Sequence, residues 1–118
     1  MTGGAGLAFS QGDYGRARAL ATQALAGART AGAAAQETVA QNMLGLAAMR
    51  QQDYDVARRH LEESLSLADK LGLVDVVAAK LNLGVLALES GEPGAAVPFF
   101  EDVLGYHRRH AFTQALRP

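Results

Sequence analysis

The stretch that decides the fold is LGLAAMRQQDYDVARRHL at residues 44–61. In it the small residue Gly45 is followed twelve positions later by Ala57, and the turn residues Gln52 and Asp53 lie between them. The same spacing of small residues recurs in two other segments, from Ala5 to Ala17 and from Gly84 to Ala96. Successive matches are offset by forty and thirty-nine residues. The sequence therefore contains an internal repeat of about forty residues.

Both halves of each unit show helical periodicity. Leu61, Leu65 and Ala68 follow Ala57 at steps of three or four, which places them on one face of a helix. The strict alternation of apolar and polar residues that is typical of strands is missing. We therefore expect an all-α fold, with helices near residues 3–11, 13–31, 34–51, 53–71, 74–90 and 94–110 and an end segment to about residue 116.

The expected helix ends carry the residue types that helix ends prefer. Asp13 and Asp53 are suited to N-caps, because a short carboxylate can accept a hydrogen bond from a free backbone N–H group. Pro93 suits a first helical turn. Gly32 and Gly72 can adopt the left-handed conformation that closes a helix at its C-terminus.

The length of 118 residues favours one domain, residues 1–118. We divide it into units at about 2–32, 33–72 and 73–111, followed by the end segment 112–118. One helix pair cannot bury both of its faces, so the pairs must stack on one another. Phe112 and Leu116 leave an apolar edge without a further pair, which indicates either a piece of a longer array or a small protein that self-associates.

Composition excludes several function classes. The 11 Lys and Arg residues against 12 Asp and Glu residues give a net charge of −1, so we expect neither direct nucleic-acid binding nor membrane binding. The absence of cysteine removes thiolate catalysis and cysteine-based metal sites. We expect a bacterial cytoplasmic location, because no targeting signal is present and no disulfide is needed.

We find no sequence signature of catalysis. Nucleotide-binding, nucleophile-elbow and zinc-protease motifs are missing, so we expect a non-enzymatic chain without a cofactor. His107 and His110 share a helical face, but the sequence offers few further ligands beside them. With Arg108 and Arg109 they place positive charge at a helix C-terminus, where the helix dipole favours it.

The repeat resembles the tetratricopeptide repeat. The similarity rests on two matched segments, Leu44-Gly45-x-x-Ala48 with Asp53-Tyr54, Ala57 and Leu61, and Leu83-Gly84-x-x-Ala87 with Ala96 and Phe100. Gln41 and Lys80 depart from the family pattern, which often has Trp there, and the unit is longer than the usual one. Such forty-residue versions resemble those of large bacterial LuxR-type regulators, Rap-type regulators and Pins-type adaptors. The resemblance implies a right-handed α-α superhelix of about three helix pairs; a HEAT-like or irregular bundle is the alternative.

The family resemblance implies that one face of the first helix of each pair contacts a partner. Because Leu44, Gly45 and Ala48 turn toward the paired helix, the opposite face and its equivalent in the next unit form the expected groove. Its residues are Val39, Asn42, Leu46, Met49, Arg50, Ala78, Leu81, Val85, Leu88 and Glu89. The groove is mostly aliphatic, which favours an apolar peptide, a helix or a neighbouring segment of the same protein, with Asn42 and Arg50 fixing its direction. Burial of these residues against further helices is the alternative.

We therefore expect a protein–protein interaction module that binds a peptide or a helix in this groove. Two alternatives remain open. One is a sensor or regulatory segment of a larger bacterial transcriptional regulator. The other is a self-associating structural unit, in which the partner is a second copy in a homodimer.

Overall fold

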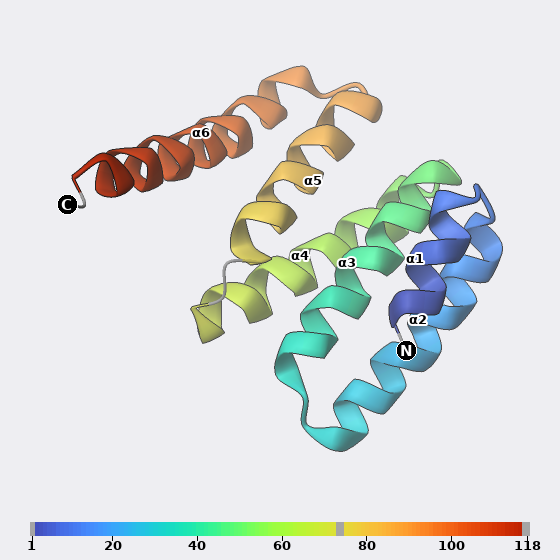
Figure 1. Ribbon diagram of the computed structural model, residues 1–118. Helices are drawn as coiled ribbons and strands as arrows, with labels where there is room; N and C mark the ends of the chain where they lie inside the picture. The colour runs from blue at the N-terminus through green and yellow to red at the C-terminus, as the bar shows by residue number, and fades with distance from the viewer. Residues whose placement is uncertain (1, 73–74, 117–118) are drawn as a thin grey trace.

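The structure of the chain, a computed structural model, describes residues 2–72 and 75–116, with side chains described from Gly4 onward (Figure 1). Within these ranges six helices follow one another without a strand, as the sequence predicted. They are α1 (Thr2–Ser10), α2 (Tyr14–Ala31), α3 (Ala34–Arg50), α4 (Tyr54–Leu71), α5 (Asp75–Glu89) and α6 (Pro93–Ala115).

The helices form three pairs that stack into an α-α superhelical repeat. In each pair the two consecutive helices, α1 and α2, α3 and α4, and α5 and α6, pack against each other. The first helices also contact one another along the stack, α1 with α3 and α3 with α5 (Figure 1). Each pair thus contacts only its neighbours, which is the organisation of a solenoid.

Two glycines set the closest approach within the second and third pairs. A Cβ atom built on Gly45 would lie 2.6 Å from Cγ of Leu61, and one built on Gly84 would lie 2.6 Å from a ring carbon of Phe100. Any side chain at these positions would therefore force the paired helix away. This contact explains the glycine at the start of the second and third segments.

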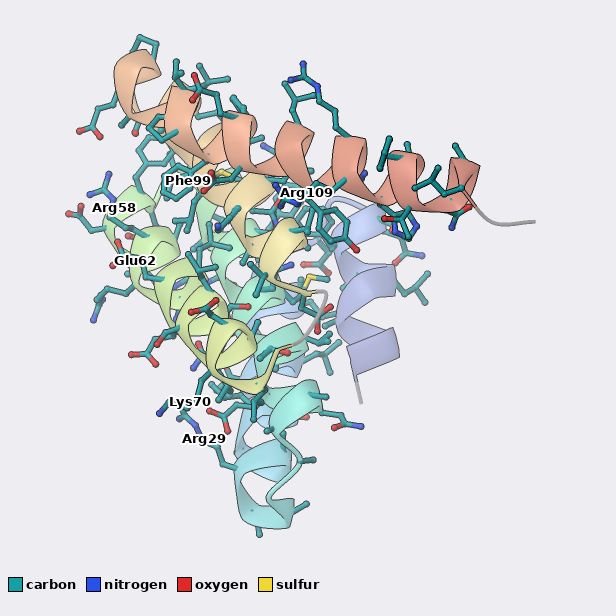
Figure 2. All side chains as sticks on the ribbon, turned by 90° about the vertical axis from the view of Figure 1, so that its left-hand side faces the viewer. Arg29, Arg58, Glu62, Lys70, Phe99 and Arg109 are labelled. Carbon is teal, nitrogen blue, oxygen red and sulfur yellow. The ribbon has the colours of Figure 1, made fainter. Side chains whose placement is uncertain are left out.

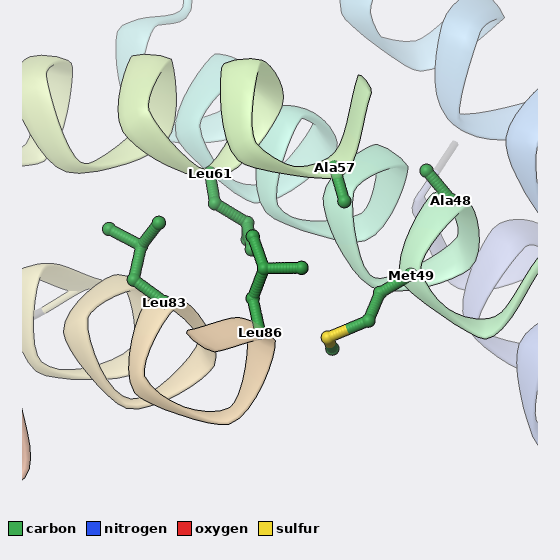
Figure 3. Close-up of a cluster of buried hydrophobic side chains, with 6 residues drawn as sticks. All are labelled: Ala48, Met49, Ala57, Leu61, Leu83 and Leu86. Atoms are coloured by element: carbon green, nitrogen blue, oxygen red, sulfur yellow. The ribbon is translucent and has the colours of Figure 1, made fainter. Parts of the chain in front are cut away.

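The largest apolar cluster lies between the second and third pairs. It consists of buried side chains from α3, α4 and α5, namely Ala48, Met49, Ala57, Leu61, Leu83 and Leu86 (Figure 3). Leu61 therefore serves two contacts, one with Gly45 in its own pair and one with the next pair. Two smaller clusters join the first pair to the second through Leu25, Ala40 and Leu44 and through Ala8, Ala17 and Ala47.

The helix ends agree with most of the sequence predictions. The carboxylate of Asp13 accepts a hydrogen bond of 3.2 Å from the backbone N–H of Arg16, and Pro93 lies in the first turn of α6. Gly32 and Gly72 close α2 and α4 with φ of 65° and 66°. Asp53 occupies the N-cap position of α4 as predicted, but its side chain makes no capping hydrogen bond and lies 3.5 Å from the guanidinium of Arg18.

The last helix is longer than expected. We placed its end near residue 110, but α6 continues through Pro98 to Ala115. The physical reason lies at position 111, where the repeat places an alanine in the register of Gly32 and Gly72. Alanine has the highest helix propensity and resists the left-handed conformation, so the chain is not turned back into another helix.

Alanine substitution of two helical glycines should have opposite effects on stability. Gly45→Ala pushes a Cβ into Leu61, so we expect the free energy of unfolding to fall by about 1–2 kcal/mol. Gly27 lies inside α2 with no atom near a built Cβ, so Gly27→Ala should raise it by about 0.5–1 kcal/mol. Urea unfolding followed by circular dichroism measures both, and equal shifts would contradict the close contact.

Candidate functional site

The strongest candidate site is the surface formed by the first helices of the second and third pairs, here called the α3–α5 face. It exposes three large aliphatic side chains, Val39 (42% exposed), Leu81 (43%) and Leu88 (50%). Ala78 is also exposed, while Leu46 and Val85 are half-buried and pack against the cluster beneath them. The face thus presents apolar side chains to solvent on two adjacent helices.

Polar contacts fix α3 to α5 along this face. The amide of Asn82 donates a 2.9 Å hydrogen bond to the carbonyl oxygen of Asn42. Two turns further along α3, the guanidinium of Arg50 donates a 2.8 Å hydrogen bond to the carboxylate of Glu89. The neighbouring repeat therefore binds Asn42 and Arg50, which were expected to fix the direction of a partner, and Glu89 of the predicted groove.

Met49 does not belong to the exposed face, and its assignment to the groove is corrected. Its side chain is only 2% exposed and belongs to the buried cluster that also contains Leu61 and Leu86 (Figure 3). The reason is that α3 is covered on this side by α5, so a position that would face a ligand in an isolated pair is enclosed in the stack. The other predicted residues lie on the face as described above.

A polar pair that sequence reasoning missed lies between α3 and α4. Gln41, 3% exposed, accepts a 2.7 Å hydrogen bond from Nδ1 of His60. The side chains of Arg29, Arg59 and Glu63 line the same crevice of about 260 Å³. Burial first, and then the charges of Arg59, Arg18 and Arg29, lower the pKa of His60 below its ordinary value, and Glu63 opposes this. The departure of Gln41 from the repeat pattern was the signal for this polar contact.

A second crevice lies on the outer side, where α4 meets the third pair. Figure 2 shows Arg58 and Glu62 of α4 beside Phe99 of α6. The guanidinium of Arg58 lies 3.7 Å from the carboxylate of Glu92 at the start of α6. This ion pair repeats the contact of Arg18 with Asp53 one unit earlier. The crevice is thus the seam between repeats, closed by a repeated ion pair.

The histidines of α6 form no assembled metal site. His107 and His110 are exposed, and the ring of Tyr106 stacks on His110 with centroids 6.0 Å apart. Within residues 2–72 and 75–116, no three His, Cys, Asp or Glu side chains are grouped to hold a metal ion. Among the described helices, none combines the length and apolar character needed to cross a membrane.

Comparison with models of protein families gives a match. A family model described as Tetratricopeptide repeat matches residues 36–109, more than half of the chain. The matched range contains both glycine contacts and all ten residues of the predicted groove. No curated protein and no solved structure matches the chain.

Truncation of two predicted groove residues should show by its effect on stability which of them is buried in the core and which lies on the surface. Met49→Ala removes buried atoms from the largest cluster, so we expect the free energy of unfolding to fall by about 2–4 kcal/mol. Leu88→Ala removes a half-exposed side chain and should change it by less than about 0.5 kcal/mol. Thermal and urea unfolding measure both, and equal losses would contradict the burial of Met49.

Protonation of His60 should destabilise the fold. Because its pKa is lower in the folded chain than in the unfolded chain, the unfolded state binds more protons, and stability falls as pH drops below the ordinary histidine value. We expect the free energy of unfolding to decrease between about pH 7 and pH 5, and His60→Gln to reduce this dependence. Identical slopes in urea unfolding of the two proteins would exclude the effect.

Proposed function

Since the chain belongs to the tetratricopeptide repeat family, whose repeats generally mediate protein–protein interactions, we propose that its α3–α5 face receives an apolar helix or extended segment of a protein partner. The observation that carries this proposal is the exposure of Val39, Leu81 and Leu88 on two adjacent helices. Aliphatic side chains grouped in this way on a soluble surface often mark an interaction site.

The binding energy would come from burial of these side chains. Covering the exposed half of one leucine contributes about 1 kcal/mol at the usual value per unit of apolar area. The face is preorganised, because the Asn42–Asn82 and Arg50–Glu89 contacts already fix α3 relative to α5. A partner then does not need to order the two helices on binding, which lowers the entropic cost of association.

The polar groups that this hydrogen-bonded contact leaves unused would set the direction in which the partner segment binds. The mutual hydrogen bond of Asn42 and Asn82 uses one oxygen and one amide group. The amide hydrogens of Asn42 and the carbonyl oxygen of Asn82 are the remaining donor and acceptor, and we assign to them the contacts with the partner backbone. Arg50, held by Glu89, takes a structural role. The module acts without catalysis and without a cofactor.

A second candidate function is a sensor or regulatory segment within a larger bacterial, cytoplasmic transcriptional regulator. Exposed Leu7 favours it, because its equivalents Ala47 and Leu86 are buried against the preceding unit. In this role the segment binds no nucleic acid and no membrane itself. Substitutions on the α3–α5 face should then alter the DNA affinity of the regulator that carries the segment.

Charge introduced on the α3–α5 face should abolish peptide binding. We propose selection of peptides from a random displayed library on the intact chain, followed by calorimetry with the synthesised peptides. Leu81→Glu with Leu88→Glu should weaken binding by at least about a hundredfold, because two buried aliphatic contacts are replaced by desolvated charges.

The matched control is Leu104→Glu, which changes a leucine of similar exposure, 53%, on α6. This variant should bind the same peptides with unchanged affinity. Peptides that lose affinity for Leu104→Glu, or that bind all variants equally, would show that the binding surface lies elsewhere.

A further inference from the structure

Helix α6 exposes the face that its two counterparts use for stacking. In the first two units the second helix contacts the next pair, Leu25 against Ala40 and Leu44, and Leu65 against the cluster that contains Leu83. The equivalent residue of α6 is Leu104, which is 53% exposed. In the described residues α6 packs mainly on α5 and meets α4 only near its start, where Phe99 lies beside Arg58 and Glu62. Its last turns extend away from the molecule (Figure 1).

The exposed face of α6 is a continuous stripe. Val97 (51% exposed), Leu104 and Phe112 (67%) lie on one side of the helix, and Leu116 (68%) follows at its C-cap. Glu101 and Arg108, both exposed, complete the same side, because successive members are three or four residues apart. We call these six residues the α6 stripe. It is apolar at both ends and carries one negative and one positive charge on either side of Leu104.

This order of residues is self-complementary when two α6 helices run in opposite directions. If a two-fold axis passes beside Leu104, Glu101 of one copy faces Arg108 of the other, and Val97 faces Phe112. A parallel arrangement would instead place Glu101 against Glu101 and Arg108 against Arg108. Since opposite charges attract and like charges repel across such an interface, the sequence of the stripe favours the antiparallel pair.

The residues fit the antiparallel pair better than the alternative, in which a second copy stacks head-to-tail on α6 and continues the superhelix. Each internal seam carries an ion pair between the second helix of one unit and the start of the next second helix, Arg18 with Asp53 and Arg58 with Glu92. In α6 the equivalent position is Val97. A head-to-tail contact would therefore bring Val97 to Asp13 and leave a carboxylate desolvated without a cation.

We propose that the α6 stripe is a homodimer interface, in which α6 of a second copy packs antiparallel on it with Leu104 at the two-fold axis. The interface is distinct from the α3–α5 face, so its test does not depend on the proposed function. One helix against one helix buries a small area, and dimers of this size are weak. The dimer would display two α3–α5 faces, which raises the apparent affinity for a partner with two binding segments.

The test is sedimentation equilibrium of the intact chain over about 10 µM to 1 mM, a range suited to weak association. We expect a monomer–dimer equilibrium. Glu101→Arg and Arg108→Glu should each raise the dimer dissociation constant by about tenfold or more, because each creates two like-charge contacts across the two-fold axis. The double variant restores opposite charges and should return the constant to within about threefold of the original.

A single introduced cysteine tests the antiparallel geometry of the dimer, because the sequence contains no other cysteine that could form a disulfide. Leu104→Cys should form an intermolecular disulfide under mild oxidation, because a residue beside a two-fold axis meets its own copy. Leu88→Cys, of similar exposure on the α3–α5 face, is the control and should remain monomeric.

Three outcomes would overturn the proposal. A monomer at every concentration would show that α6 does not pair. Dimerisation insensitive to both charge reversals would exclude this interface. Weakening by each single reversal without recovery in the double variant would exclude the antiparallel register. Circular dichroism of each variant verifies the fold, which exposed residues 101 and 108 should leave intact.

Discussion

The structure depends on a close contact between a glycine in the first helix of a pair and a large side chain in the second helix. In the repeat this side chain lies four positions after the alanine that follows the glycine by twelve residues. Gly45 receives Leu61, and Gly84 receives Phe100. Because no Cβ separates the two helices there, they approach closely enough for Leu61 to reach the next pair as well. A single short distance thus sets both the geometry of the pair and the contact that stacks one pair on another, so local packing and the superhelix cannot vary independently.

The polar contacts between units also fix the geometry of the stack. Arg18 with Asp53 and Arg58 with Glu92 join successive second helices, while Arg50 with Glu89 joins successive first helices. All are partly exposed, so each contributes little to stability. Their placement on both sides of the apolar cluster instead fixes the angle at which units meet. The α3–α5 face is a product of this angle, because it depends on two helices from different units lying side by side.

The sequence was sufficient to predict the features that are local to one helix or one pair and that recur in each repeat. Periodicity and glycine spacing predicted the helices and the paired contacts, and Gly32 and Gly72 predicted two helix ends. The extension of α6 was also readable, since position 111 is Ala where the register requires Gly, although the basic run at residues 107–110 is typical of a helix C-terminus. The burial of Met49 and the pairing of Arg50 with Glu89 were not readable, because helical periodicity describes a face of one helix and not the angle of the next unit.

The nearest-neighbour organisation also determines how the molecule opens. The central pair packs against a neighbouring pair on each side, whereas α6 packs mainly on α5 and meets the central pair only near its start. In a linear array the free energy of local opening falls toward units with one neighbour. Backbone amides of α6 should therefore exchange with solvent through small fluctuations that leave α3 and α4 closed. The helix that carries the most exposed apolar surface is thus also the one that can detach most readily, so any partner that covers it would act as a cap and slow the opening of the whole array from that end.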